Sequence, residues 1–331
     1  MNSPPHWQPA ATFEALRLRA QLVTAIRDFF AARGVLEIDT PVLAHAASTA
    51  PQLHSLVTRY TGPLAPQGTP LYLHTSPEFA MKRLLAAGSG AIYQISKAFR
   101  DGEYGRWHNP EFTLLEWYRP DYDHHALMDE VAALIAYLPM LQLTDSERTP
   151  YGSLFQHHAG IDPHTASVAE LQACALGHGV AMAGHSPHER DSWLDLLLTH
   201  SVIPQLRPDC LHFIYDYPAS QAALARVRPA GPGQAHALAE RFELYINGIE
   251  LANGFHELGD SVEQRRRFEH ENNQRTSCGL PPVPIDEHLL SALAHGLPAC
   301  AGVALGIDRL LMLAGGYSHI NEVIAFPFER A

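Results

Sequence analysis

The stretch FRDGEYGRWHNPEFTLLEWYR, residues 99–119, decides the fold. A predicted strand over residues 91–99 leads into it. A polar, glycine-containing loop over 101–110 follows, and the stretch ends in a second predicted strand over 112–118. Beyond this pair, further strands are predicted at 35–39, 211–217, 242–246, 249–252 and 302–306. They are separated by helices without a βαβ rhythm, which predicts an α+β fold with an antiparallel sheet flanked by helices.

One face of the strand at 112–118 carries chemically distinct side chains. Strand side chains alternate between faces, so this face bears Phe112, Leu114, Glu116 and Tyr118. An aromatic ring, a carboxylate and a phenol in line can stack a flat base at one end and neutralise an ammonium at the other. The alternative is an ordinary amphipathic strand with Glu116 in a structural ion pair.

A second hairpin is indicated around Asn247-Gly248, the preferred pair for a type I′ turn. A two-residue turn places Tyr245 opposite Glu250, so Glu243 becomes the diagonal neighbour of Glu250, roughly 7–8 Å away at Cα on the same face. Two carboxylates on one face need a positive partner, and Mg²⁺ carrying substrate phosphates is one candidate. The alternative is a solvated strand face paired with Arg or Lys.

Two further segments offer candidate binding groups. Asn253, Phe255 and Glu257 alternate onto one face, whereas Glu250 has the opposite parity. A bulge or kink near Gly254 would be needed to turn both sets toward one cleft. In the second segment, Gly306-Ile-Asp-Arg309 opens a helix, and a helix N-terminus with an arginine is a ready anion site. The alternative there is an Asp N-cap followed by a surface arginine.

Helix signals fill the rest of the chain. The segment 12–33 has apolar residues at helical spacing and ends at Gly34. Ser76-Pro77-Glu78 predicts a second helix with Ser76 as N-cap, Pro77 as its first residue and Gly88 as its exit. Further helices are expected over 126–141, after a capping box at Ser186 and Glu189, from Ser261 to Gly279, and from Asp308. Residues 41–70 are expected to form a Pro-, Gly- and Ala-rich loop.

Composition bounds the class of protein. The chain has 331 residues, of which 46 % are hydrophobic and 18 % charged, and its formal net charge is −12. Because phosphate neutralisation needs a basic face, this charge argues against a broad RNA-docking surface. Cys174, Cys210, Cys278 and Cys300 form no C-x-x-C pair, so they predict neither a zinc site nor a disulfide framework. Neither a signal peptide nor a run of 18 apolar residues is found, so we expect a cytoplasmic protein.

Four ordered motifs together resemble the class II aminoacyl-tRNA synthetases. Residues 99–119 resemble motif 2 of that family, with HNPEFTLLEWY similar to the lysyl subgroup, and GVALGIDRLLML at 302–313 resembles motif 3. FFAARGVLEIDTP at 29–41 resembles motif 1, whose proline lies at a dimer interface, and GIELANGFHEL at 248–258 is again lysyl-like. The resemblance implies a single catalytic domain over 1–331, a homodimer, and 150–235 as a less motif-rich insertion.

The resemblance also implies residue roles. For ATP it assigns Arg100 to the α-phosphate, Arg309 to the γ-phosphate, Phe112 to adenine, and further contacts to Asp101, Gly102, Glu103, His108, Asn109, Glu250, Leu251 and Gly306. For Mg²⁺ it assigns Glu243 and Glu250. For the amino acid it assigns Ser76, Pro77, Glu78, Glu116, Tyr118, Asn253, Phe255, Glu257 and Ala304. Its carboxylates suit a dication such as lysine, because each buried ammonium needs a partner. The reaction would be in-line attack of the substrate carboxylate on the α-phosphorus, with catalysis by positioning and charge neutralisation.

Three features depart from lysyl-tRNA synthetases. The first predicted helix begins within about 12 residues of Met1, so we expect no anticodon-binding domain and no tRNA partner. Ala304 replaces a glycine, and PASQAALA at 218–225 resembles the short lysyl-synthetase paralogues that attach (R)-β-lysine to a lysine of elongation factor P. The motif 2 glutamate is displaced by one position to Glu103, so either a shifted loop or the backbone makes its contact. Alternatives are a lysyl-adenylate former with another acceptor and a non-catalytic amino-acid-binding paralogue.

Overall fold

The computed structural model describes residues 7–141, 143, 145–180 and 189–331. Within it the chain forms two compact units, each built on its own set of strands. The first comprises Met1–Asp121, Tyr137–Leu141 and Gly259–Ala331, and the second comprises Tyr122–Ala136 and Gln142–Leu258. In the described part of the chain, no helix is both long enough and apolar enough to cross a membrane.

The first unit is organised around the predicted strand pair. Strands β5 (Ile92–Phe99) and β6 (Glu111–Pro120) pair antiparallel, and β12 (Cys300–Gly306) pairs antiparallel with the other edge of β6. The two-residue strand β1 (Leu36–Glu37) adds to β5 in parallel. This order, β1-β5-β6-β12, confirms the predicted strands and the predominance of antiparallel pairing.

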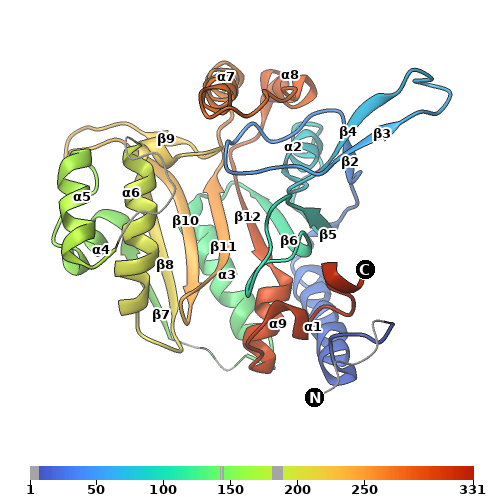
Figure 1. Ribbon diagram of the computed structural model, residues 1–331, viewed down its shortest axis with the longest axis horizontal. Coiled ribbons are helices and arrows are strands. Elements are labelled where there is room, and N and C mark those ends of the chain that lie inside the picture. Colours follow the sequence, from blue (N-terminus) through green and yellow to red (C-terminus); the bar gives the residue numbers. More distant parts are fainter. Residues whose placement is uncertain (1–6, 142, 144, 181–188) are drawn as a thin grey trace. The chain divides into compact units, whose positions relative to one another are not determined.

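Helices cover both faces of this sheet (Figure 1). Helix α1 (Phe13–Ala31) packs on one face, where the Phe30 ring stacks on Tyr93 at 4.5 Å and meets Trp117 edge-on at 5.4 Å between centroids. Helix α2 (Glu78–Ala86) packs Met81 and Leu85 on the opposite face. Helices α7 (Ser261–Ser277) and α8 (Glu287–Gly296) pack on each other, and α8 also contacts α2. Helix α9 (Ile307–Gly315) follows β12 directly and contacts α1.

The second unit carries the other predicted hairpin. Its strands run in the order β7 (Ser146–Pro150), β8 (Leu211–Pro218), β10 (Leu238–Ile246) and β11 (Ile249–His256), and the short β9 (Val227–Arg228) pairs with β10. The β7–β8 pair is parallel, and the β8–β10 and β10–β11 pairs are antiparallel. Helix α3 (His124–Tyr137) precedes these strands, and all but its last residue belong to this unit.

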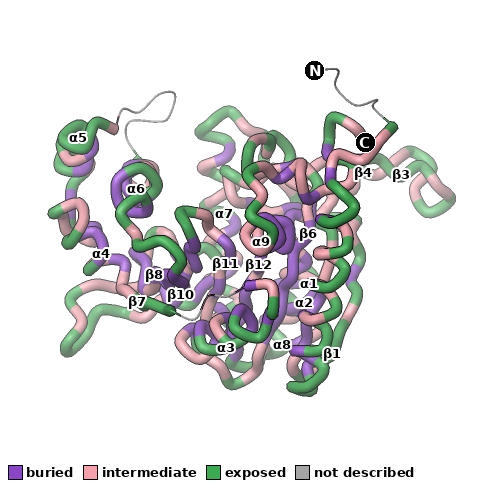
Figure 2. The backbone as a smooth tube through the Cα atoms, turned by 90° about the horizontal axis from the view of Figure 1, so that it is seen from below, coloured by how far each residue is buried: buried purple, intermediate pink, exposed green. Residues whose placement is uncertain are grey.

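Three helices build a core on the second unit's strands. They are α4 (Tyr151–His158), α5 (Val168–Gly177) and α6 (Arg190–Leu197), continued by a π-helical turn at Leu198–Val202 and a 3-10 turn at Ile203–Gln205. Tyr151 stacks on Phe155 and lies against Tyr217 of β8, and Leu194 and Leu197 are fully buried in the same cluster. Figure 2 shows buried residues, drawn in purple, in these helices and in the strands beside them.

The structure corrects several local expectations. Pro77 rather than Ser76 holds the N-cap position of α2, because Glu78 is the first residue with helical hydrogen bonding. Asp260 rather than Ser261 caps α7, since its carboxylate accepts the N–H groups of Val262 and Glu263. The expected capping box at Ser186 lies outside the described residues, and Glu189 is the N-cap of α6.

The segment expected to be a loop between 41 and 70 contains strands. A three-stranded sheet has the order β2 (Leu43–Ala44), β4 (Thr69–Leu73) and β3 (Val57–Tyr60). Every residue of β3 is exposed, so the alternation of buried and exposed positions that reveals a strand in sequence is absent there. Pairing with β4 alone defines this strand.

Candidate active site

Glu116 is the centre of a buried polar group in the first unit. Its side chain lies on the middle strand β6, directly opposite Gln94 of β5 and Ala304 of β12, and only 2 % of the residue is exposed. The Ser76 and Tyr118 hydroxyls each donate a hydrogen bond of 2.7 Å to its carboxylate. Burial, and then the neighbouring charge of Glu78, raises the pKa of Glu116 to about 7.

Ser76 connects this carboxylate to the start of α2. Its hydroxyl accepts the Glu78 N–H at 3.1 Å while it donates to Glu116, so one side chain fixes both the helix start and the orientation of the carboxylate. Pro77 at the N-cap holds the backbone between them. Predicted site residues Ser76, Glu78, Glu116 and Tyr118 are therefore brought together.

Sequence reasoning missed Lys82. This lysine is 1 % exposed, and its ammonium pairs with Glu78 at 2.6 Å one turn along α2. The spacing of four residues could have indicated the pair. Lys82 also lowers the pKa of Glu116, but burial and the charge of Glu78 outweigh it, so this pKa stays raised.

Ala304, which stands where lysyl-tRNA synthetases have a glycine, lies beside Glu116 in the sheet. It is the β12 residue in register with Glu116, and Gly302 is in register with Tyr118. Residues in register across a strand pair share a face and stand about 5 Å apart at Cβ. The Ala304 methyl group therefore borders the space next to the carboxylate.

Two arginines flank His108. The Arg309 guanidinium, in the first turn of α9, lies 2.7 Å from the His108 Nε2 and donates from Nε to the Trp107 carbonyl at 3.3 Å. Burial, and then the charges of Arg309 and Arg100, lowers the pKa of His108, although Glu103 opposes them. A neutral His108 can accept a hydrogen bond from Arg309 and hold this guanidinium in place. Gly306 is the N-cap of α9 and leaves the helix start open on that side.

Arg100 belongs to the same positive region. Its guanidinium lies 5.0 Å from the Phe112 ring centroid and 3.4 Å from the Glu103 carboxylate. Its Nε–H is buried without a hydrogen-bond acceptor in the described part of the chain. A buried donor of this kind needs a partner, and an anionic oxygen would supply one.

The displaced glutamate has a structural explanation. Asp101 donates its N–H to the His54 carbonyl, and Gly102 follows with φ +80°, a left-handed conformation that glycine adopts without strain. This turn accommodates the additional residue and brings Glu103 beside Arg100.

Asn109 and Asp308 act within the fold. The Asn109 amide donates to the Glu111 carbonyl at 2.6 Å and accepts the Phe328 N–H at 3.0 Å, so main-chain groups occupy both its ends. Asp308 is not an N-cap: it is buried, accepts the Thr113 N–H at 2.6 Å and pairs with Arg19. It joins α9 to β6 and α1, and this places Arg309 next to it.

In the second unit a β-bulge changes which face of the hairpin the side chains point to. Tyr245 pairs with Glu250 as predicted, but Leu244 pairs with Ala252, which makes Leu251 an additional buried residue. The alternation shifts there, so Glu243 comes opposite Asn253 rather than Ala252. The expected bulge therefore exists, three residues before Gly254, and turns Glu250, Asn253 and Phe255 toward the face of Glu243.

Arg241 is the cation of this face, and sequence reasoning missed it. It pairs with Glu243, donates to Asn253 Oδ1 at 3.3 Å, and lies 5.6 Å from the Phe255 ring centroid. Its spacing of two residues from Glu243 on a strand was the signal that could have indicated it. Glu243 thus has an arginine partner, but the pair lies on a buried rather than a solvated strand face.

Two tyrosines complete the shell around Glu243. Tyr217 and Tyr245 each donate a hydrogen bond of 2.7 Å to Oε2, and burial, then the charge of Glu243, raises the pKa of both phenols well above 10. Glu257 follows β11, is buried, and its backbone bridges to Ala225.

Comparison with known proteins agrees with the fold and the motifs. The family model described as tRNA synthetases class II (D, K and N) matches residues 7–330. The chain therefore belongs to this family. Family membership implies the use of ATP, usually with Mg²⁺.

Within this family the chain is similar over its length to proteins named elongation factor P–(R)-β-lysine ligase. The relative from Vibrio parahaemolyticus is 52 % identical over 326 residues, which cover 98 % of this chain and 99 % of the relative. The relative from Yersinia enterocolitica is 50 % identical over 331 residues, all of both chains. The relative from Photobacterium profundum is 49 % identical over 325 residues.

Proposed function

We propose that the protein activates (R)-β-lysine with ATP and transfers it to a lysine side chain of elongation factor P. The substrate carboxylate attacks the α-phosphorus and releases diphosphate, which leaves a β-lysyl-adenylate. The acceptor amine then attacks the carbonyl carbon, AMP leaves, the amine loses a proton, and an amide forms. The observation that carries the proposal is about half identity, along the entire chain, to ligases of this name.

In the first unit, Glu116 would bind a substrate ammonium. A cation beside this carboxylate would favour its charged form and so lower its raised pKa. Glu78, Ser76, Pro77 and Tyr118 would orient it, and Ala304 would set the distance between the sheet and the substrate backbone.

The positive region of the first unit would bind the nucleotide. Arg100 would meet the α-phosphate with its buried Nε–H, and Arg309 would meet the γ-phosphate from the positive end of α9. Phe112 would stack on adenine, with His108, Asn109 and the turn at Asp101, Gly102 and Glu103 around it. Developing negative charge on the phosphates would be neutralised by groups already in place.

The second unit would hold the metal ion. Glu250 and Glu243 would be its carboxylate ligands, and the ion would neutralise phosphate charge. A carboxylate has about four acceptor positions, and Arg241, Tyr217 and Tyr245 use three on Glu243, so one is left for a cation. The buried Leu251 fixes the bulge that turns Glu250, while Asn253, Phe255 and Glu257 would contact the amino acid.

We also propose a homodimer built through motif 1, a cytoplasmic location shared with the translation factor, and no tRNA acceptor.

Pyrophosphate exchange with (R)-β-lysine and with α-lysine tests the activation step. Mass measurement of elongation factor P after incubation with ATP and (R)-β-lysine tests the transfer. We expect exchange with the β-isomer and one added β-lysyl group. If neither isomer supports exchange, the proposed enzymatic activity is refuted. If α-lysine is strongly preferred, the proposed substrate is refuted.

A further inference from the structure

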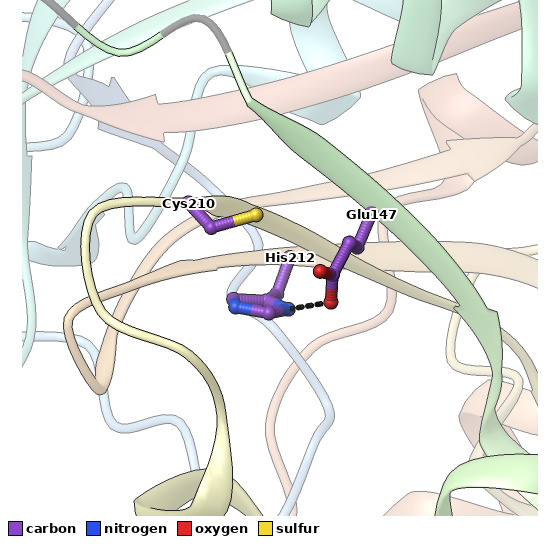
Figure 3. A group of neighbouring side chains, drawn as sticks. All are labelled: Glu147, Cys210 and His212. Carbon is purple, nitrogen blue, oxygen red and sulfur yellow. Dashed lines mark ion pairs between the residues drawn. The ribbon is translucent and has the colours of Figure 1, made fainter.

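Three metal-ligating side chains gather on β7 and β8 of the second unit. Among the described residues, Glu147, Cys210 and His212 offer one ligand atom each, and these atoms all lie within 4.8 Å of one another. Figure 3 shows the thiol, the imidazole and the carboxylate turned toward a common space. None of them takes part in the proposed chemistry with ATP.

The strand register explains why these side chains meet. Cys210 immediately precedes β8 and His212 is its second residue, so these side chains, two positions apart, lie on the same side of the chain. The parallel neighbour β7 places Glu147 in register with His212, and the Leu211 N–H donates to the Asp145 carbonyl at 2.9 Å. The beginnings of these two strands therefore bring D-x-E (145–147) and C-x-H (210–212) side by side, from positions more than sixty residues apart.

His212 is oriented as a metal-binding histidine often is. Its Nε2 lies 2.8 Å from the Arg207 carbonyl, and its Nδ1 lies 3.4 Å from the Glu147 carboxylate. A backbone carbonyl that accepts the Nε2 proton leaves the Nδ1 lone pair directed at the cluster, an arrangement that supports a metal ligand. The imidazole and Cys210 are buried, while Glu147 is about half exposed and leaves a route from solvent.

In the absence of a metal ion, Arg207 supplies the positive charge beside Glu147, Cys210 and His212. Its guanidinium lies 3.2 Å from the Cys210 Sγ and 3.3 Å from the Glu147 carboxylate, and its other nitrogen lies 3.3 Å from Asp145. Arg207 is half exposed, so its side chain can turn into solvent while its backbone carbonyl keeps holding His212. A metal cation and the guanidinium are then alternative occupants of one space.

We propose that Glu147, Cys210 and His212 bind Zn²⁺, with Arg207 displaced and water or Asp145 in the fourth position. Sulfur, nitrogen and oxygen ligands together suit zinc, whose bonds of about 2.0–2.3 Å in a tetrahedron require ligand atoms roughly 3.5 Å apart. Since the three ligand atoms already lie within 4.8 Å of one another, binding requires the side chains to rotate closer together. Binding displaces the Cys210 thiol proton to solvent, as thiolate ligation of a metal requires.

Titration of the full-length protein with Co²⁺ alone tests the site, because a cobalt–thiolate bond gives a sulfur-to-metal charge-transfer absorption that histidine binding does not. We expect this absorption at one equivalent, its loss in Cys210→Ser, and its retention in the matched control Cys278→Ser, whose thiol is exposed. No absorption at one equivalent, or an absorption that survives Cys210→Ser, would overturn the proposal.

Two variants keep the test decisive if Cys210→Ser does not fold. Competition for Zn²⁺ with a chromophoric chelator should show at least about tenfold weaker binding in Glu147→Gln, which changes an exposed carboxylate. Arg207→Ala should bind more tightly than the parent protein, because the competing cation is removed and the carbonyl on His212 is kept. Unchanged affinity in both variants would show that Zn²⁺ binds elsewhere.

Discussion

Glu116→Gln should stabilise the protein at alkaline pH while it weakens substrate binding. Burial and the charge of Glu78 raise the pKa of Glu116 from 4.5 to about 7 in the folded protein. Between these values the folded state binds more protons than the unfolded state, so its stability falls as pH rises. At about 1.4 kcal/mol per pH unit, the charged carboxylate costs about 3 kcal/mol above pH 7.

Glutamine removes that cost because it carries no charge. It retains one acceptor, so one of the hydroxyl hydrogen bonds from Ser76 and Tyr118 must be replaced by donation from its amide. A rearranged hydrogen bond is worth about 1 kcal/mol, which reduces the expected gain to about 1–3 kcal/mol at pH 8. At pH 5 the wild-type carboxyl is largely protonated, and the gain should disappear.

Urea unfolding of both proteins at pH 5 and pH 8 measures this difference. Glu269→Gln is a suitable control, because it removes an exposed carboxylate from α7. The same proteins should be titrated with (R)-β-lysine at pH 8, where Glu116→Gln should bind at least about tenfold less tightly for loss of a buried charge partner. A variant less stable than wild type at pH 8, or a gain independent of pH, would refute the reasoning.

Three further changes probe other parts of the site. Arg309→Ala should reduce pyrophosphate exchange at least about a hundredfold, as loss of a phosphate-neutralising group does, with an unchanged circular dichroism spectrum; normal exchange would contradict its role. Ala304→Gly should shift the exchange preference toward α-lysine, and unchanged selectivity would show that the methyl group is not the discriminator. Arg241→Ala should lower the free energy of unfolding by about 3–5 kcal/mol, because it leaves Glu243 buried without its ion pair, and a loss below about 1 kcal/mol in urea titration would contradict that.

Local sequence patterns predicted most of what positions the site. Alternation placed Glu116 and Tyr118 on one face of β6, and the Asn247-Gly248 turn gave the correct pairing of Tyr245 with Glu250. These features depend on neighbouring residues of the chain, which sequence periodicity describes directly.

The ion-pair and hydrogen-bond partners of the buried charged residues could not be predicted in the same way. Lys82 beside Glu78 and Arg241 beside Glu243 have ordinary local spacing, and only burial makes them ion pairs of consequence. Asp308 joins Thr113 and Arg19, which are distant in sequence. The three-stranded sheet at 43–73 was missed because β3 has no buried face to give it a pattern.

The bulge at Leu251 shows most clearly where periodicity stops being sufficient. With strict alternation, Glu250 would point to one face of the strand, and Asn253 and Phe255 to the other. A single additional residue brings all three side chains to the same face, so they can act on one substrate. A flexible loop could also reverse the alternation of faces, but it would not hold a ligand set in place. Leu251, in contrast, is buried, and strand pairs flank it on both sides (Tyr245 with Glu250, Leu244 with Ala252). The hairpin therefore combines a fixed backbone with convergent side chains, which catalysis by positioning and charge neutralisation requires.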